Sequence, residues 1–208
     1  MKTNTLAAAL AATALLAGCA GSTQQNDAQL SAKALGMMKA SFKERGIAKL
    51  DRLDQDQTQA LCSQYAVNPP PKDVAAKIEK VNLDAIKPPS DGKYLGDWKR
   101  GEQIAQRGTG FQWSDTEKTP VGANCYACHQ LTKEEISYGT IGPTLYNFAK
   151  VRGFGPDIQK YAWGKVYNAQ AYAACSNMPR FGHNRILTEQ QIKDVVALLM
   201  DPESPVNK

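Results

Sequence analysis

Apolar residues recur every three or four positions along most of this chain, and that spacing predicts α-helices. The last of these stretches begins at Thr188, which can form a capping box with Gln191, and it ends before Pro202. Residues 97–107 and 157–169 also predict helices. The apolar stripe of the last stretch consists of Ile192, Val195, Val196 and Leu199. No stretch alternates apolar and polar residues for long enough to predict a strand, so we expect an all-α fold.

The N-terminal half of the chain predicts a second group of helices, separate from those of the C-terminal half. Residues 28–65 lack Pro and predict two helices with a break between them. Residues 72–86 predict a third helix, which a Pro-Pro-Ser-Asp-Gly run closes. This run indicates a boundary between two regions. We therefore expect a tether and helical extension over residues 20–91 and a C-terminal domain over residues 92–203.

The first residues predict export from the cytoplasm. Lys2 precedes an apolar stretch over residues 6–18, which at 13 residues is too short to span a bilayer as a helix. We interpret residues 1–18 as a signal peptide. The Leu-Ala-Gly-Cys sequence resembles a bacterial lipobox, so Cys19 is a candidate lipid anchor, with ordinary cleavage after Ala20 as the alternative. Either interpretation predicts a periplasmic protein, and lipidation would tether it to a membrane.

The charge of the chain does not indicate a polyanionic partner. The formal net charge is +5, and acidic and basic residues are interspersed along the sequence. No run of Lys and Arg is long enough to predict nucleic-acid binding. A mildly basic surface is the simpler interpretation, and we expect no nucleic-acid partner.

Cys125-Tyr126-Ala127-Cys128-His129 is the most informative sequence in the chain. It has the C-x-x-C-H spacing of covalent haem c attachment. Cysteines three positions apart lie about one helical turn from each other, so both thiols can reach the vinyl groups of one haem while His129 binds the iron. A zinc site would need a second ligand pair, and a thioredoxin-like motif would need a strand followed by a helix. The sequence supports neither, and we expect one covalent haem c.

The sixth iron ligand has several candidates. Met178 lies 49 residues after His129, which is enough chain to reach the second face of the haem. The Pro that follows Met178 limits the backbone freedom of its loop, and this suits a weak thioether ligand. His183 is the main alternative, but its Gly and Asn neighbours predict a solvent-facing position. We expect His129 and Met178 as the axial ligands, a pair that raises the reduction potential relative to two His ligands. The remaining candidates are Met37, Met38 and Met200.

Residues 141–145, Ile-Gly-Pro-Thr-Leu, resemble the loop beside the proximal histidine of small monohaem cytochromes c. The resemblance implies that the carbonyl of Pro143 accepts a hydrogen bond from His129 and fixes its imidazole. Together with the haem motif before this loop and a Met-Pro pair after it, the resemblance implies a class I cytochrome c-like domain. Arg152 and Arg180 could pair with the haem propionates or face solvent.

The five cysteines divide into three groups. Two belong to the haem motif, and Cys19 is either lipidated or removed with the signal peptide. Cys62 and Cys175 remain, and export would place them in an oxidising compartment. We therefore expect a disulfide between them, with two separate buried thiols as the alternative. The bridge would connect the extension to the loop of Met178.

Three stretches of the C-terminal domain are similar to the SoxX family, the monohaem subunits of SoxAX cytochromes. They are residues 124–131 (NCYACHQL), 138–145 (YGTIGPTL) and 175–187 (CSNMPRFGHNRIL). The similarity covers about residues 92–203. It implies a heterodimer with a SoxA-type cytochrome, in which this chain takes electrons from the SoxA haem and passes them to a soluble cytochrome c. The implied enzyme, L-cysteine S-thiosulfotransferase, joins thiosulfate to a cysteine of a SoxYZ-type carrier.

The resemblance assigns no catalytic residue to this chain, because the sulfur-transfer residue of such complexes belongs to the SoxA subunit. It implies that Cys125, Cys128, His129 and Met178 bind a haem used for electron transfer. Two other functions stay open. A freestanding or membrane-tethered electron carrier would have the same motifs, whereas a haem sensor would need an open sixth position, which Met178 argues against.

Overall fold

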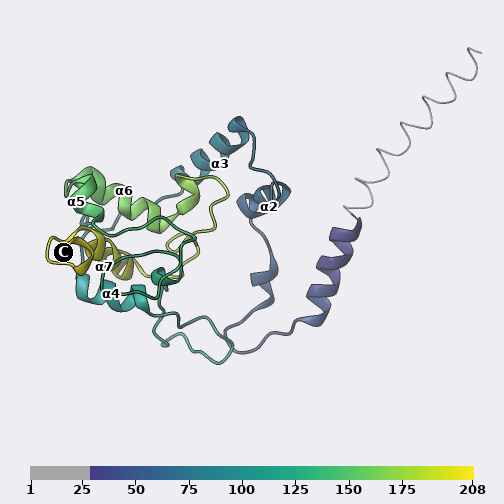
Figure 1. Ribbon diagram of the computed structural model, residues 1–208. Coiled ribbons are helices and arrows are strands. Elements are labelled where there is room, and N and C mark those ends of the chain that lie inside the picture. The colour runs from purple at the N-terminus through teal and green to yellow at the C-terminus, as the bar shows by residue number, and fades with distance from the viewer. Residues whose placement is uncertain (1–28) are drawn as a thin grey trace, which may run out of the picture. The chain divides into compact units, whose positions relative to one another are not determined.

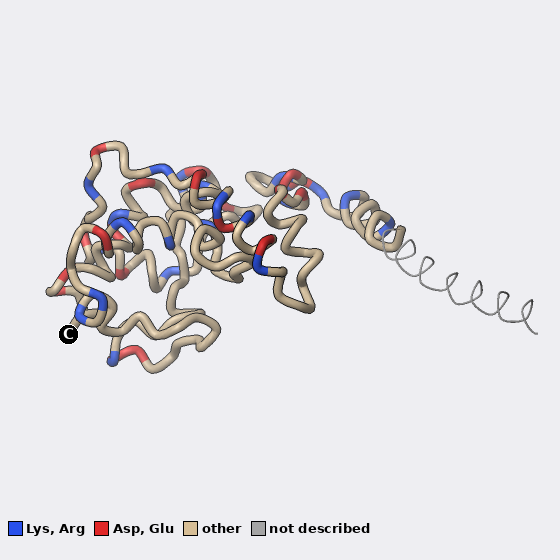
Figure 2. The backbone as a smooth tube through the Cα atoms, turned by 90° about the horizontal axis from the view of Figure 1, so that it is seen from above, with Lys and Arg blue, Asp and Glu red and all other residues tan. Residues whose placement is uncertain are grey.

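The computed structural model describes residues 29–208, which divide into two compact units (Figure 1). The first unit ends at Asp54, and the second spans Gln55–Lys208. The signal peptide predicted over residues 1–18 and the candidate anchor Cys19 lie outside the described residues. Among residues 29–208, no helix is both long enough and apolar enough to cross a membrane. Acidic and basic residues are interspersed along the described chain, as Figure 2 shows.

The first unit is a helix followed by a short irregular segment. Residues 29–41 are helical. Arg45 and Ala48 then form an isolated antiparallel bridge. Gly46, inside this turn, has a φ of +53°, a conformation that glycine adopts without steric cost. The 3-10 turn η1 (Leu50–Leu53) completes the unit, so the predicted break between two helices is longer than a single residue.

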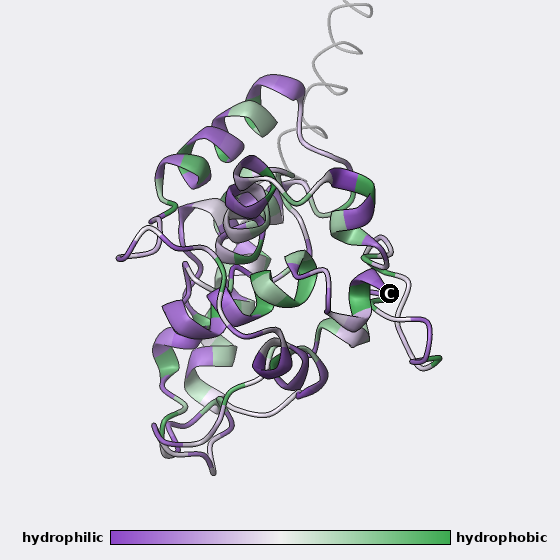
Figure 3. Ribbon diagram, turned by 90° about the vertical axis from the view of Figure 1, so that its left-hand side faces the viewer, coloured by the Kyte–Doolittle hydropathy of each residue, from purple (hydrophilic) through white to green (hydrophobic). Residues whose placement is uncertain are grey.

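The regular elements of the second unit are α-helices and short 3-10 turns joined by irregular segments, and no strand is present in the described part of the chain (Figure 1). This confirms the all-α fold class. The helices are α2 (Gln57–Gln64), α3 (Lys72–Asp84), α4 (Trp98–Gln106), α5 (Phe148–Arg152), α6 (Pro156–Tyr167) and α7 (Glu189–Met200). The 3-10 turns are η2 (Cys125–Ala127), η3 (Ala169–Ala171) and η4 (Pro205–Asn207). Hydrophobic and hydrophilic bands alternate along the ribbons in Figure 3, as they do in amphipathic helices.

Side-chain caps explain where the predicted helices begin. Asp97 caps α4 by accepting a hydrogen bond from the Lys99 N–H at 2.8 Å. Thr188 and Gln191 form the predicted capping box at the start of α7. α5 was not predicted, because its five residues are too few to show a helical period.

α7 is the centre of the core. Every residue in the range Ile192–Met200 is buried, and the helix packs against α4 and α6. Gly101 of α4 approaches α7 so closely that a Cβ at this position would overlap the backbone of Asp194. Met200, which the sequence left among the candidates for the sixth ligand, is buried in this core.

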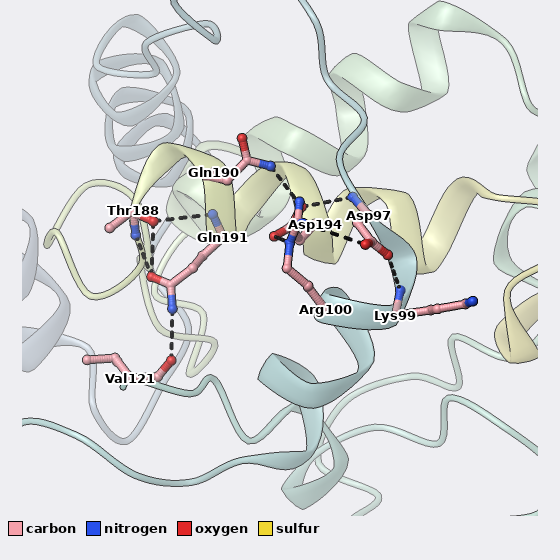
Figure 4. Close-up of polar contacts among 8 residues, drawn as sticks. All are labelled: Asp97, Lys99, Arg100, Val121, Thr188, Gln190, Gln191 and Asp194. Atoms are coloured by element: carbon pink, nitrogen blue, oxygen red, sulfur yellow. Dashed lines mark hydrogen bonds and ion pairs between the residues drawn. The ribbon is translucent and has the colours of Figure 1, made fainter. Parts of the chain in front are cut away.

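A buried carboxylate joins α4 to α7 (Figure 4). The side chain of Asp194 is 3% exposed and accepts hydrogen bonds from Arg100 Nε at 2.9 Å and from the Asp97 N–H at 2.8 Å. Gln190 Nε2 donates to the same carboxylate at 2.9 Å. Burial alone would raise the pKa of Asp194, but these donors outweigh burial and hold the pKa below its usual range. The two helices therefore share a charged contact as well as an apolar one.

The second unit includes α2 and α3, which the sequence assigned to the extension. The predicted boundary after Asp91 lies in a segment that packs on the core. Trp163 Nε1 donates to the carbonyl of Lys87 at 2.9 Å, and Lys193 pairs with Asp91 at 2.7 Å. The Pro- and Gly-rich composition therefore marks a packed connection here, and the compact unit begins well before it.

Candidate haem-binding site

The haem motif folds as η2, one tight turn that brings its functional groups together. Asn124 precedes the turn in a left-handed conformation, with a φ of +47°. The N–H groups of Cys128 and His129 both donate to the carbonyl of Cys125, at 3.1 and 2.9 Å. Neither Cys125 nor Cys128 forms a disulfide, and burial raises the pKa of the Cys125 thiol to about 12. Two thiols and one imidazole thus share a single turn, as covalent haem attachment requires.

Pro143 holds the imidazole of His129. The Nδ1 atom of His129 lies 2.7 Å from the carbonyl oxygen of Pro143. Because a carbonyl can only accept a hydrogen bond, Nδ1 carries the proton and donates it. In the neutral imidazole, the other ring nitrogen, Nε2, then has its lone pair available for a metal ion. This contact confirms the hydrogen bond expected from the resemblance to small monohaem cytochromes c.

Residues 139–145 run beside the motif and pair with its backbone. Three N–H groups of this segment donate to carbonyls of the motif region at distances between 2.7 and 2.9 Å. The pairs are Gly139 to Tyr126, Gly142 to Cys128 and Leu145 to Gln130. A Cβ on Gly142 would overlap the ring of His129. Glycine is therefore needed at this position for the segment to approach the imidazole.

Two side-chain contacts fasten the motif region to the helices. The buried Tyr126 donates its hydroxyl to Glu102 Oε1 of α4 at 2.8 Å, and burial raises the pKa of Tyr126. Gln191 of α7 donates to the carbonyl of Val121 at 2.9 Å (Figure 4). Sequence reasoning did not single out Tyr126. The available signal was the large aromatic side chain between the two cysteines. Because both thiols must stay accessible on the same turn, this side chain has to point away from them.

Met178 lies in the loop between η3 and α7. It is partly buried, and it packs against the same apolar core as Cys125. Its N–H donates to Ser176 Oγ at 3.2 Å. The other four predicted site residues therefore lie close together, in two segments joined by hydrogen bonds, whereas Met178 reaches the same core from a separate loop. These four are Cys125, Cys128, His129 and Pro143. The role of Met178 as an axial ligand stays a prediction.

A disulfide between Cys62 and Cys175 connects the Met178 loop to α2. The two Cα atoms are 5.3 Å apart, and the bond joins residues separated by 113 positions. The predicted bridge is therefore confirmed, and the alternative of two separate buried thiols is wrong. Since Cys175 comes three residues before Met178, α2 is attached to the chain very near the candidate ligand.

An ion pair forms a second connection between α2 and this loop. Asp56, the N-cap of α2, pairs with Arg180, whose side chain is 5% exposed. Burial alone would raise the pKa of Asp56, but the Gln59 N–H and the Arg180 guanidinium outweigh burial and hold it below its usual range. The sequence left Arg180 as a propionate partner or a solvated residue. Burial excludes the solvated position, and Asp56 supplies a negative partner within the chain.

His183, the competing ligand candidate, lies beside the same carboxylate. Its Nε2 is 3.9 Å from Asp56 Oδ2, and its side chain is 33% exposed. Burial and the charge of Arg180 lower the pKa of His183, and Asp56 opposes them. The expected solvent-facing position is therefore found only in part, because most of the side chain is covered.

α3 supports the Met178 loop from another direction. Glu79 Oε1 accepts the N–H of Ala174 at 3.1 Å, one residue before the disulfide. The buried Asn82 accepts a hydrogen bond from Asn168 at 2.9 Å and donates to Thr58 Oγ1 of α2 at 3.0 Å. α2 and α3 are thus bonded to each other and to the chain on the N-terminal side of Met178.

The donor set fits a covalently bound haem. Two free thiols and an imidazole with its Nδ1 engaged occupy one turn, and the partly buried thioether of Met178 lies against the same core. Over residues 29–208, no group of three or more His, Cys, Asp or Glu side chains gathers in a way that could hold a metal ion.

Comparison with known proteins agrees with this chemistry. The family model for cytochrome c matches residues 118–201, which include the haem motif and Met178. A protein of Aquifex aeolicus (strain VF5), described as an uncharacterized lipoprotein, is 38% identical over 156 residues, which cover 74% of this chain and 73% of the relative. A cytochrome c domain implies a covalently bound haem c. The chain therefore belongs to the same family as this Aquifex protein and contains a cytochrome c domain.

Proposed function

We propose that this chain is a monohaem electron-transfer protein with His129 and Met178 as the axial iron ligands. The observation that carries the proposal is the hydrogen bond between His129 Nδ1 and the carbonyl of Pro143, which in the neutral ring directs Nε2 to a metal ion, next in sequence to two cysteines that form no disulfide. When bound, the haem would supply a one-electron couple between ferrous and ferric iron. The chain's own residues would attach it through Cys125 and Cys128 and hold the imidazole in one orientation.

The two axial residues would set the reduction potential in opposite ways. The hydrogen bond to Pro143 makes the His129 ring a more basic ligand. The thioether of Met178 is a soft ligand that favours ferrous iron and raises the potential. A filled sixth position suits electron exchange with protein partners better than the binding of a small molecule. The haem-sensor alternative is therefore the weaker one.

The absorption spectrum of the oxidised protein tests the ligand pair. A sulfur-to-iron charge-transfer band should appear at the red end of the spectrum, and Met178→Ala should abolish it. His183→Ala is the matched control, since His183 is the competing candidate, and it should keep the band. Loss of the sixth ligand in His183→Ala but not in Met178→Ala would overturn the assignment. A haem count of one per chain is expected from the single C-x-x-C-H motif.

We further propose that the chain is the SoxX-type subunit of a SoxAX complex. The three SoxX-like stretches support this, and so does the position of Cys175 three residues before Met178. In this role the chain would take electrons from the haem of a SoxA-type partner and pass them to a soluble cytochrome c. The complex would act as an L-cysteine S-thiosulfotransferase on a SoxYZ-type carrier.

The sulfur-transfer nucleophile would belong to the partner subunit. In this chain Cys62 and Cys175 form a disulfide, and Cys125 and Cys128 belong to the haem motif. Purified alone, the chain should exchange electrons with small redox partners and should not couple thiosulfate to a thiol acceptor. Thiosulfate-dependent coupling by this chain alone would contradict the subunit proposal without affecting the ligand assignment.

A freestanding or membrane-tethered electron carrier is the second candidate function, because the same haem site would serve it equally well. Purification from the native periplasm followed by haem counting distinguishes the two. A SoxX-type subunit should co-purify with a second haem-containing chain. A carrier that works alone should purify with one haem and no second chain.

We propose a periplasmic location with Cys19 as the lipid anchor. The Leu-Ala-Gly-Cys sequence supports the anchor, and the description of the Aquifex relative as a lipoprotein supports it as well. Mass spectrometry of the mature N-terminus tests this, and an acylated Cys19 is the expected result. An unmodified N-terminus after Ala20 would indicate ordinary cleavage instead.

A further inference from the structure

We propose that the helix over residues 29–41 binds the surface of an anionic bilayer through one apolar face. This helix is the most N-terminal described element of the chain (Figure 1). The proposal rests on the periplasmic location and lipid anchor proposed above, and it adds a second membrane contact to them. The haem site takes no part in it.

The apolar residues of this segment share one side of the helix. At about 100° per residue, the large apolar side chains and Ala34 fall within an arc of roughly 160°; they are Leu30, Ala34, Leu35, Met37, Met38 and Phe42. Phe42 follows the helix directly, and its N–H donates to the carbonyl of Met38 at 2.9 Å, which continues the last turn. Leu30, Met37 and Phe42 are 63%, 64% and 56% exposed. The helix thus has the period of a packed helix and leaves its apolar stripe uncovered.

This exposure sets the helix apart from those of the second unit. All residues from 29 to 42 are exposed, whereas α4 buries Gly101, Ile104 and Ala105 on its core side. Single exposed apolar residues are common on protein surfaces, but a row of them along one helix face marks an interaction surface.

The charges of the segment match an anionic surface. Lys33, Lys39 and Lys43 lie outside the apolar arc, and residues 29–43 contain no Asp or Glu. Lys39 forms an ion pair with Asp54 in the same unit. Helices that lie in a membrane interface combine an apolar face with Lys side chains that extend towards anionic headgroups. The segment has this combination.

The length of chain before the helix favours a bilayer over other occupants. Nine residues, 20–28, separate Cys19 from the first described residue of the helix. A fully extended chain spans about 3.5 Å per residue, so an acylated Cys19 would hold the helix within roughly 35 Å of the headgroups. The 13 described helical residues are too few to cross the membrane. Lying flat on its surface is the arrangement that would cover the apolar face.

Vesicle co-sedimentation of the haem-loaded protein tests this proposal. The mature chain is produced with Cys19→Ala behind a cleavable export signal that adds no lipid, so that binding reports the protein surface alone. It should bind vesicles of phosphatidylglycerol and phosphatidylethanolamine more tightly than vesicles of phosphatidylcholine. Met37→Gln combined with Met38→Gln should weaken binding by about tenfold or more, because two apolar side chains lose their burial. Failure of the parent protein to bind the anionic vesicles would overturn the proposal.

Ala32→Gln combined with Ala40→Gln is the matched control. Both residues lie on the opposite side of the helix, and the change adds the same polar group without changing the charge. Gln is a good helix former, so neither variant pair should unfold the helix. The control should bind vesicles as the parent does. Equal loss of binding in both variant pairs would mean that the apolar face is not the membrane contact.

Hydrogen exchange over residues 29–42 identifies the occupant of this face. Protection should appear when the anionic vesicles are added. Protection that appears instead with a second haem-containing subunit, or with rising protein concentration alone, would overturn the proposal in favour of a protein partner or a second copy. The charge-transfer band, recorded on the same samples, should be unchanged in every variant. A failed membrane contact is therefore distinguishable from a failed ligand assignment.

Discussion

The two sides of the proposed haem site are held by contacts of different range. On the His129 side, the hydrogen bond to Pro143 spans 14 positions of sequence. On the Met178 side, the disulfide spans 113 positions, and the ion pair of Arg180 spans 124. Neighbours in sequence thus hold the histidine, and a segment at the start of the second unit holds the methionine loop.

This difference has a physical consequence for the sixth ligand. A short loop costs little conformational entropy to close, so the His129 side can form from one contiguous stretch of sequence. The loop of Met178, the proposed thioether ligand, is bonded to α2 and α3 instead. We infer that α2 and α3 stabilise the position of the sixth ligand.

The largest effect is expected from Cys62→Ser combined with Cys175→Ser. The chain-entropy model gives roughly 5 kcal/mol for a loop of this length, less whatever native-state strain the bond stores. The guanidinium midpoint of unfolding should fall, whereas the haem should stay covalently attached at the other side. Reduction of the parent protein under mild conditions should reproduce the fall. An unchanged midpoint in both experiments would show that the bridge does not contribute to stability.

Gly142→Ala should affect the opposite side of the site. A Cβ here overlaps the ring of His129, and such overpacking costs about 1–3 kcal/mol and displaces the imidazole. We expect less haem per polypeptide after export, measured by haem absorbance against protein mass. Gly155→Ala is the control, since a Cβ at Gly155 meets no atom within 4 Å. Equal haem content in the two variants would contradict the close packing of this segment on His129.

Asp56→Asn should loosen the Met178 side by a smaller amount. Asn is as good an N-cap as Asp, so α2 should keep its start, but the buried Arg180 loses its charged partner. The cost should be roughly 1–2 kcal/mol, because Asp56 is partly solvated. The charge-transfer band should disappear at a lower temperature than in the parent protein. Asp91→Asn removes a similar ion pair, with Lys193, away from this loop and should leave the band in place. If the band disappeared at the same temperature in both variants, Asp56 would not hold the Met178 loop more than any other ion pair does.

Asp194 is expected to distinguish the two sides least. It joins α4 to α7 in the core against which both Cys125 and Met178 pack. Its pKa is held below the usual range, so the folded protein binds fewer protons than the unfolded chain in acid. This stabilisation is complete above the unfolded pKa near 4 and is lost as the pH falls through the folded value. Asp194→Asn should flatten the acid part of a plot of urea midpoint against pH. A variant curve as steep as that of the parent below about pH 4 would contradict this assignment.

Local sequence patterns, together with the resemblance to small monohaem cytochromes c that implied the Pro143 contact, predicted most of the His129 side. The spacing of Cys125, Cys128 and His129, the Gly-Pro loop and the capping box at Thr188 each depend on residues a few positions apart. The structure has the capping box and the hydrogen bond to Pro143 as expected. The disulfide was also predictable, because only two cysteines were left after the others had been assigned.

The parts that sequence did not predict depend on long-range packing. The ion pair between Asp56 and Arg180 leaves no periodic or motif signal in either segment. The grouping of α2 and α3 with the rest of the second unit likewise leaves no local signal, since a Pro-rich run looks alike in an exposed linker and in a packed connection. The role of a buried polar residue such as Asn82 can be recognised only once its hydrogen-bond partner, far away in sequence, is known.

An imidazole titration of the oxidised protein tests most directly whether α2 holds the sixth ligand. With the proposed ligation, added imidazole would compete with Met178 for the iron, so the imidazole concentration at which the charge-transfer band is half lost would measure how firmly the loop holds the thioether. We expect Cys62→Ser with Cys175→Ser to lower this concentration by at least about tenfold, which corresponds to roughly 1.4 kcal/mol of lost support. The same midpoint in the parent and in the variant would contradict the inference that the N-terminal helices of the second unit stabilise Met178 as a ligand.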